Sequence, residues 1–237
     1  MTGSIELAEI GAAIGEPARA AILTALMDGR ALTAGELAFF ARVTPQTASE
    51  HLRRLCEVRL LSVLKQGRHR YFRLASPLVA QMVESMGVVA AVQAPPRYRP
   101  ASRADDAIRA ARLCYDHLAG RLAVDIADRL TQRGHLLLGP EGGELTATGR
   151  RFLSELGVAI PDAAETRRAF CRPCLDWSER RFHVAGYVGA ALARHALDQG
   201  WIARIRDSRA VAVTAKGSEA LREAFGLEFA AVEQRAA

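Results

Sequence analysis

Apolar residues recur at helical spacing through the first third of the chain. Residues 5–14 (IELAEIGAAI) and 17–27 (PARAAILTALM) each predict a helix, and Gly29 follows the end of the second. A third, shorter helix (TAGELAFFA) is expected after Thr33, because Glu36 three residues later completes a capping box. The pattern therefore predicts three successive helices before residue 44.

A fourth helix is predicted from Pro45 to about Val58, within the stretch TPQTASEHLRRL. Proline suits the first helical position because its φ angle is already fixed near the helical value. Leu52 and Leu55 supply one apolar face. The opposite face is polar and carries Gln46, Thr47, Ser49, Glu50, His51, Arg53 and Arg54.

Two strand-like runs follow, LLSVL and HRYFRL, and the tripeptide KQG between them predicts a hairpin turn. The resulting order of helix, helix, turn, helix and hairpin is that of a winged helix-turn-helix. In that arrangement the second helix of the turn enters the DNA major groove while the hairpin follows the backbone or the minor groove.

Basic residues gather in the same segment. The chain carries a formal charge of +6, and the segment from Arg42 to Arg73 alone has a surplus of six positive charges. A basic block on a polar helix favours contact with phosphates. The alternative is a winged helix used only for protein association. The residues expected to contact DNA are Thr44, Pro45, Gln46, Thr47, Ser49, His51, Arg53, Arg54, Lys65, Arg68, His69 and Arg70.

The segments EPARAAILTAL, TAGELA, TPQTASEHLRRL, LLSVLKQGRHRYFRL and SPLVAQMVESMG together resemble the ArsR-type family of bacterial winged-helix repressors, over residues 4–92. The resemblance implies a homodimer joined through the first and last helices of this domain. It also implies binding to a palindromic operator and release by an inducer, either a metal or a small molecule.

The chain departs from this family at its usual metal sites. Metal-sensing members carry cysteines in the third helix, or histidine and acidic ligands along the dimer helix. Here the third helix reads GELAFFARV and the predicted dimer helix offers only Glu84. The metal chemistry of the family is therefore not expected at those positions. Cys56, on the fourth helix, is interpreted as a packed core residue.

Residues 94–104 (APPRYRPASRA) predict a linker between a DNA-binding and dimerisation domain at 1–93 and a second domain at 105–237. The second domain contains an internal repeat, HLAGRLAVDIADRLTQRGHL…LTATGRRFLSEL and HVAGYVGAALARHALDQGWI…VTAKGSEALREA. Each copy predicts a helix, a glycine stop, a hairpin and a second helix opened by threonine. The expected fold class is mainly α with small β-hairpins (α+β): a winged helix-turn-helix followed by two winged-helix-like repeats.

Residues with reactive side chains lie near the two helix starts, in CYDH and in CRPCLDWSERRFH. Cys114, His117, Cys174 and His183 could form a soft tetrahedral site for a zinc-like ion if the repeats meet. Cys171 and Cys174 could instead form a redox pair, or the cysteines could simply pack beside a small-molecule pocket near Trp177. The sequence leaves these three interpretations open.

Composition narrows the class of protein. No run of eighteen apolar residues occurs, and four cysteines in an apparently cytosolic chain argue against a disulfide framework. We expect a cytoplasmic, non-membrane transcriptional regulator without enzymatic activity. Two alternatives remain at this stage: an enzyme with a DNA-binding appendage that uses Cys174 and His183, and a winged-helix protein-interaction module.

Overall fold

Two compact units make up the chain, residues 1–84 and 85–237. The computed structural model describes residues 2–67, 69–93, 103–161, 169–206 and 208–231. The predicted linker 94–104 lies outside the described residues, apart from its last two positions, which begin a helix.

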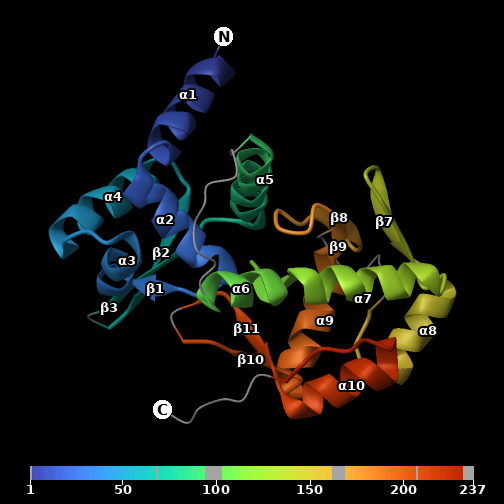
Figure 1. Cartoon of the computed structure of the whole chain (residues 1–237). Helices are drawn as coiled ribbons and strands as arrows, with labels where there is room; N and C mark the ends of the chain where they lie inside the picture. The colour runs from blue at the N-terminus through green and yellow to red at the C-terminus, as the bar shows by residue number, and fades with distance from the viewer. Residues whose placement is uncertain (1, 68, 94–102, 162–168, 207, 232–237) are drawn as a thin grey trace. The chain divides into compact units, whose positions relative to one another are not determined.

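The described part of the first unit contains four α-helices, a short 3-10 helix, a three-stranded sheet and the N-terminal part of a fifth α-helix (Figure 1). Their order is that of a winged helix-turn-helix, as predicted. The elements are α1 (Thr2–Ile14), α2 (Pro17–Ala25), the 3-10 helix η1 (Leu26–Asp28), β1 (Leu32–Thr33), α3 (Ala34–Ala41), α4 (Pro45–Glu57), β2 (Leu61–Gln66), β3 (His69–Leu74) and α5 (Pro77–Gln93).

Local capping fixes where these helices begin. The Glu16 side chain accepts a hydrogen bond from the backbone of α2, and Thr33 and Glu36 form the predicted capping box on α3. Thr44 caps α4, where its hydroxyl accepts a hydrogen bond from the Thr47 amide at 3.2 Å. The start of α4 is therefore held by its own sequence.

The sheet has the order β1-β3-β2, and all its pairs are antiparallel. β2 pairs with β3 from Leu61 opposite Leu74 to Gln66 opposite His69. The strand thus continues through Lys65 and Gln66, so the turn is tighter than the predicted KQG. The two-residue strand β1 is too short for a sequence pattern to reveal.

The core of the first unit comes from the apolar faces of α2, α3 and α4 and from the sheet. Leu52 and Leu55 are buried, as their spacing predicts, and they share the interior with Ile22 and Leu37. The side of α4 opposite these leucines remains free for other contacts.

The second unit repeats one order of elements: hairpin, helix, hairpin, helix. The first set comprises β4 (Arg112–Cys114), β5 (His117–Ala119), α7 (Arg121–Gln132), β6 (Leu136–Gly139), β7 (Gly142–Leu145) and α8 (Ala147–Glu155), after the leading helix α6 (Arg103–Ala110). The second set comprises β8 (Arg172–Leu175), β9 (Phe182–Ala185), α9 (Gly186–Asp198), β10 (Ile202–Arg204), β11 (Val211–Val213) and α10 (Ala215–Phe225).

Both sets use the same residues at their junctions. Thr146 and Thr214 cap α8 and α10 by accepting hydrogen bonds from the amides of Gly149 and Gly217. A Cβ added at either glycine would collide with a backbone carbonyl of the preceding hairpin. The threonine and glycine pair that the repeat aligns is therefore required for the hairpin to pack on its helix.

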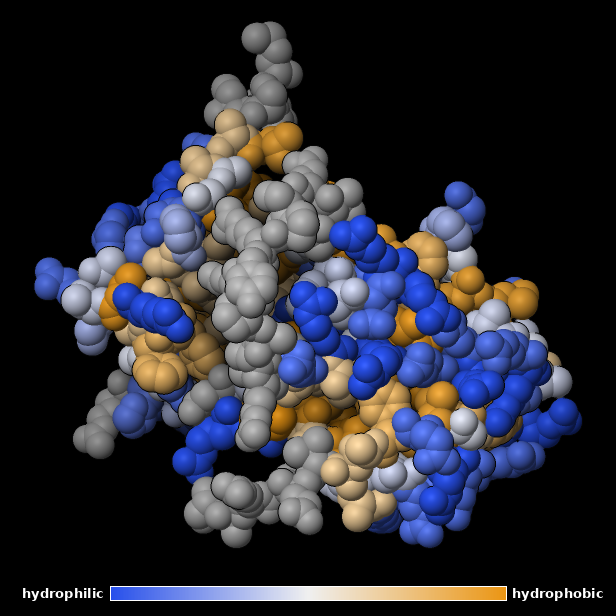
Figure 2. Space-filling view, viewed as in Figure 1, coloured by the Kyte–Doolittle hydropathy of each residue, from blue (hydrophilic) through white to orange (hydrophobic). Residues whose placement is uncertain are grey.

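A single apolar cluster fills the second unit. It includes Leu122, Ile126 and Leu136 from the first set, and Val188 and Phe225 from the second. In the orientation of Figure 2, the exposed side of α7 is largely hydrophilic, in keeping with its buried apolar face. The two copies of the sequence repeat thus share one core.

No single helix among the described residues is long and apolar enough to cross a membrane. The bent pair Glu6–Ile14 and Pro17–Asp28 passes the test of length and composition only when its halves are counted together.

Candidate nucleic-acid interface and a buried cysteine–histidine cluster

The polar face of α4 is exposed from its first turn onward. Thr44, Pro45, Gln46, Thr47 and Ser49 all lie on the surface. The Ser49 hydroxyl donates to the Pro45 carbonyl at 2.8 Å, and the hydroxyls of Thr44 and Thr47 lie 2.9 Å apart. The exposed helix start thus presents short hydroxyl side chains around the longer amide of Gln46.

Arg53 extends from the same helix and pairs with acidic residues of its own chain. Its guanidinium forms ion pairs with Glu50 and Glu57, one turn to either side. Arg54 lies 3.7 Å from Glu57. Because these groups are substantially exposed, water screens the pairs and a phosphate can replace the carboxylates.

His51, another predicted DNA contact, lies against its own chain. It is half-buried against α2, with Nε2 3.6 Å from the Glu16 carboxylate and Nδ1 3.5 Å from the Arg19 guanidinium. The His51 ring thus faces the N-terminal end of α2, and its contact with DNA stays a prediction.

The hairpin β2–β3, the wing of the motif, carries a second set of basic residues in addition to the arginines of α4. Lys65, His69 and Arg70 are exposed near its tip, and the Arg70 guanidinium lies 5.8 Å from the Phe72 ring centroid. Arg68, the remaining predicted contact, lies outside the described residues. The described part of the wing therefore presents its cationic side chains to solvent.

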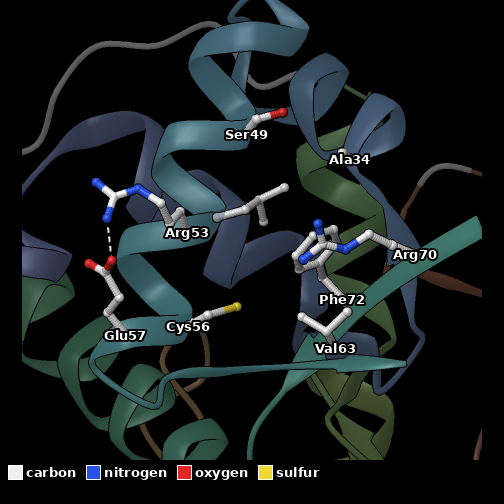
Figure 3. A pocket seen from close by; sticks show the side chains of 9 residues that line it. Ala34, Ser49, Arg53, Cys56, Glu57, Val63, Arg70 and Phe72 are labelled. Carbon is white, nitrogen blue, oxygen red and sulfur yellow. Dashed lines mark hydrogen bonds and ion pairs between the residues drawn. The ribbon is translucent and has the colours of Figure 1, made fainter. Parts of the chain in front are cut away.

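A groove of about 660 Å³ separates α4 from the wing. In Figure 3 the Cys56 thiol points into this groove and Arg53 points away from it toward Glu57, while Arg70 lies beside Phe72. Cys56 is half-buried, and burial raises its thiol pKa. Cys56 is thus a groove-lining residue, which corrects its interpretation as core.

In the second unit, two hairpins each place a cysteine directly opposite a histidine. Cys114 pairs with His117 across β4–β5, and Cys174 pairs with His183 across β8–β9. Directly opposed residues of an antiparallel pair lie on the same face of the hairpin. Cys174 and His183 are nine residues apart in sequence, yet they form the same kind of cross-strand pair as Cys114 and His117, which are three residues apart.

These four side chains meet inside the unit. One ligand atom from each lies within 4.8 Å of every other, and all four residues are buried. The Nε2 atoms of His117 and His183 are 3.2 Å apart. The structure brings together all four residues that the sequence suggested as a soft-metal site.

A carboxylate stands behind each imidazole. Asp116 Oδ1 lies 3.3 Å from His117 Nδ1, and Asp176 Oδ2 lies 3.3 Å from His183 Nδ1. Both rings therefore turn Nδ1 toward an acid and Nε2 toward the centre of the cluster. Here and below, cluster means Cys114, His117, Cys174 and His183.

Asp176 also connects the two sets of elements. Its Oδ2 accepts hydrogen bonds from the Gly120 amide at 2.7 Å and from the Arg112 guanidinium at 2.9 Å. Asp176 and Arg112 are both fully buried, so they form an internal ion pair between the hairpins. Burial alone would raise the pKa of Asp176, but its contacts with His183 and Arg112 hold that pKa well below the usual range.

Electrostatics inside the cluster favour a deprotonated thiol. A hydrogen bond with Cys114 lowers the pKa of Cys174, which outweighs the opposite effect of burial, and both histidines act in the same direction. Burial lowers the pKa of His183, whereas its contacts with Asp176 and Cys174 raise it above the usual value.

Cys171 lies apart from this arrangement. It precedes β8 and packs near Gly143 of β7, and burial raises its thiol pKa to about 11. Cys171 is thus not among the four residues whose ligand atoms gather around Cys174, and the thiol in that group is Cys114.

The Trp177 ring lies against two arginine side chains. The guanidinium groups of Arg112 and Arg109 lie 4.7 and 5.5 Å from its ring centroid. The Trp177 ring therefore makes cation–π contacts with both arginines, and one of them, Arg112, also forms the ion pair with Asp176.

Comparison with known proteins shows the family of this chain. A helix-turn-helix domain family matches residues 14–63. The HTH-type transcriptional regulator YdfF of Bacillus subtilis (strain 168) is 42% identical over 217 residues, which cover 92% of this chain and 96% of YdfF. The chain belongs to the HTH-type transcriptional regulators. The regulator carries a winged helix-turn-helix DNA-binding domain.

Solved structures similar to the regulator include the homodimeric winged helix-turn-helix DNA-binding domain of Mb0332 from Mycobacterium bovis, at 24% identity and TM-score 0.38 over 42% of this chain and 92% of that one. Reduced HlyU from Vibrio cholerae matches at 25% identity and TM-score 0.34, over 37% and 92% of the two chains. The cadmium sensor CMTR from Mycobacterium tuberculosis matches at 30% identity and TM-score 0.31, over 40% and 96%.

Two important residues of the regulator's second unit were not anticipated from sequence. Arg112 gave no signal, because a single arginine in an arginine-rich chain does not stand out as buried. Asp116 lay within the noted CYDH motif but was not assigned a role. Its position directly before His117 is the one feature that could have suggested it.

Proposed function

We propose that the regulator is a homodimeric repressor that binds a palindromic operator and is released by a signal received in its second unit. The observation that carries the proposal is the exposed polar face of α4 beside a basic wing. That combination provides base-reading and phosphate-binding groups on adjacent elements.

The side chains divide into two roles. Gln46 can donate to and accept from an adenine edge at once, and Thr47 and Ser49 can reach bases or phosphates beside it. Phosphate contacts are assigned to the basic groups of helix and wing, which position the protein without reading sequence. These are Arg53, Arg54, Lys65, His69 and Arg70, together with Arg68, which lies outside the described residues.

Exposed apolar side chains support a dimer. Leu7 of α1 is 70% exposed, while Leu78 and Val89 of α5 are 73% and 56% exposed. Met86 of α5 is also exposed, and its spacing from Leu78 and Val89 places all three on one side of the helix. Burial of such side chains against a second copy is favourable. The helices concerned are those through which the family resemblance implies dimerisation.

Selection from a random pool of duplex DNA tests this proposal. The full chain should enrich one palindromic sequence, and sedimentation should give the mass of two chains bound to one duplex. The dimer follows from the apolar helices and the palindrome follows from the dimer. Enrichment of no sequence, with full solubility and native mass, would instead support a winged-helix module for protein association.

A further inference from the structure

We propose that Cys114, His117, Cys174 and His183 bind one zinc ion per chain in a closed tetrahedral site that joins the two repeats of the second unit. This inference goes beyond the proposed function and does not depend on it, since metal content is measured without DNA. Neither repeat can supply the site alone, because each contributes one cysteine and one histidine.

The spacing of the ligand atoms suits zinc. Tetrahedral zinc with Zn–N bonds of about 2.0–2.1 Å sets its two histidine nitrogens about 3.3–3.4 Å apart. The Nε2 atoms of His117 and His183 are separated by 3.2 Å. All four donor atoms already lie within 4.8 Å of one another, so small side-chain shifts complete the coordination sphere.

The carboxylates beside the two histidine rings favour binding of a cation between the Nε2 atoms. Asp116 and Asp176 each face a Nδ1 atom, which favours the proton on Nδ1. When both rings are neutral, the two Nε2 atoms present lone pairs to each other at 3.2 Å. Two facing lone pairs repel unless a positive charge lies between them.

Charge balance leads to the same ion. All four side chains are buried, and a buried unpaired charge is costly. Two thiolates and two neutral imidazoles around a divalent cation form a group with no net charge. The neighbouring ion pair between Arg112 and Asp176 is likewise neutral as a pair.

The type and number of ligands indicate a structural site. A tetrahedral set of two sulfurs and two nitrogens is typical of zinc, and four protein ligands leave no coordination position for a substrate. The ion would connect hairpin β4–β5 to hairpin β8–β9 at the point where Asp176 already bonds to Arg112 and Gly120.

The metal content of the full chain tests the proposal. Protein purified under reducing conditions, incubated with Zn(II) and desalted should retain one zinc per chain in its native mass. Cys174→Ser should lose the ion, whereas Cys171→Ser should keep it. The control is closely matched, because it removes the other thiol of the same CRPC motif but leaves the cluster intact.

A second variant covers the case in which Cys174→Ser fails to fold. Asp116→Asn retains all four ligands and should weaken zinc binding about 10- to 100-fold, the usual effect of losing a carboxylate behind a ligating histidine. Co(II) bound to the same protein should show the visible absorption of a tetrahedral site with thiolate ligands, and Cys171→Ser should leave that spectrum unchanged.

Three results would overturn the proposal. The first is a chain that retains no zinc after loading. The second is equal loss of zinc from Cys171→Ser and Cys174→Ser. The third is a metal-free chain whose mass falls by two hydrogens on mild oxidation, with Cys114 joined to Cys174, which would make the cluster a thiol switch.

Discussion

Arg53 on α4 illustrates how a single side chain can serve both the free protein and the bound complex. In the free chain it lies between Glu50 and Glu57, which neutralise its charge on an exposed helix face. Exposed pairs of this kind add little to stability. They nevertheless place negative charge on the surface to which we assign DNA binding, and so they oppose the approach of phosphates.

Removing one of these acids should therefore tighten DNA binding. Glu57→Gln keeps the size of the side chain but removes one of the two acidic partners of Arg53, and with it a negative charge from the interface. We expect several-fold tighter binding to any duplex at low salt, with a smaller gain as salt screens the charges. Fluorescence anisotropy measures the change. Glu155→Gln, on an exposed site of α8, should have no effect, and equal gains in both variants would contradict the assigned surface.

Arg112 holds a buried positive charge inside the second unit. It is fully buried, it bonds to Asp176, and its guanidinium lies over Trp177. Removal of one partner from a buried ion pair leaves the other charge without compensation.

Arg112→Ala should destabilise the second unit by about 3–5 kcal/mol, the usual cost of breaking a buried pair. Urea unfolding followed by tryptophan fluorescence reports on this unit alone, since both tryptophans, Trp177 and Trp201, belong to it. Arg129→Ala, on the exposed face of α7, serves as the matched control. Coincident midpoints for the two variants would show that the ion pair does not support the fold.

At the scale of elements, some helices and hairpins could be predicted from the sequence and others could not. The amphipathic helices, the capping box at Thr33 and the β2–β3 hairpin were predictable because each has a local signal. The strands β4, β5, β8 and β9 were missed, since they are only three or four residues long and largely buried. The cross-strand pairing of Cys174 with His183 follows from these hairpins and therefore could not be read from spacing.

The junction between a hairpin and its following helix has a strict requirement for glycine. A Cβ at Gly149 would collide with the His135 carbonyl, which accepts the hydrogen bond of the Thr146 amide. Gly149→Ala should therefore lower the stability of the second unit by about 1–3 kcal/mol or more, the cost of overpacking.

Gly142→Ala is the matched test for that junction, because nothing lies within 4 Å of a Cβ at Gly142. Thermal unfolding followed by tryptophan fluorescence should show a lower midpoint for Gly149→Ala and little change for Gly142→Ala. An unchanged midpoint for Gly149→Ala would mean that the helix can shift away from the hairpin.

At the scale of the whole molecule, the chain contains a short DNA-binding unit and a longer unit whose two repeats share one core. The sequence predicts a boundary at residues 94–104, whereas the structure divides the chain after Glu84, within α5. The sequence does not specify which residues meet in the core of the second unit, such as Val188 and Leu122, because packing between distant segments leaves no local pattern. Assembly is the remaining property at this scale.

The proposed dimer predicts the effect of a charge on α5. Leu78→Glu places a carboxylate on the exposed apolar side of that helix and should dissociate the dimer, since burying the charge is unfavourable. Analytical ultracentrifugation should then give the mass of one chain. Leu137→Glu alters a similarly exposed leucine in the second unit and should leave the mass unchanged. A dimer that persists in Leu78→Glu would place the interface elsewhere.

The salt dependence of DNA affinity tests most directly whether α4 and the wing recognise bases and bind phosphates. The affinity is measured on the selected duplex and on a scrambled one, for the full chain and for Gln46→Ala. Affinity should fall steeply with salt on both duplexes, as expected for phosphate contacts. Gln46→Ala should lose about 1–3 kcal/mol on the selected duplex alone. Salt-independent affinity, or equal losses on both duplexes, would contradict the assigned interface.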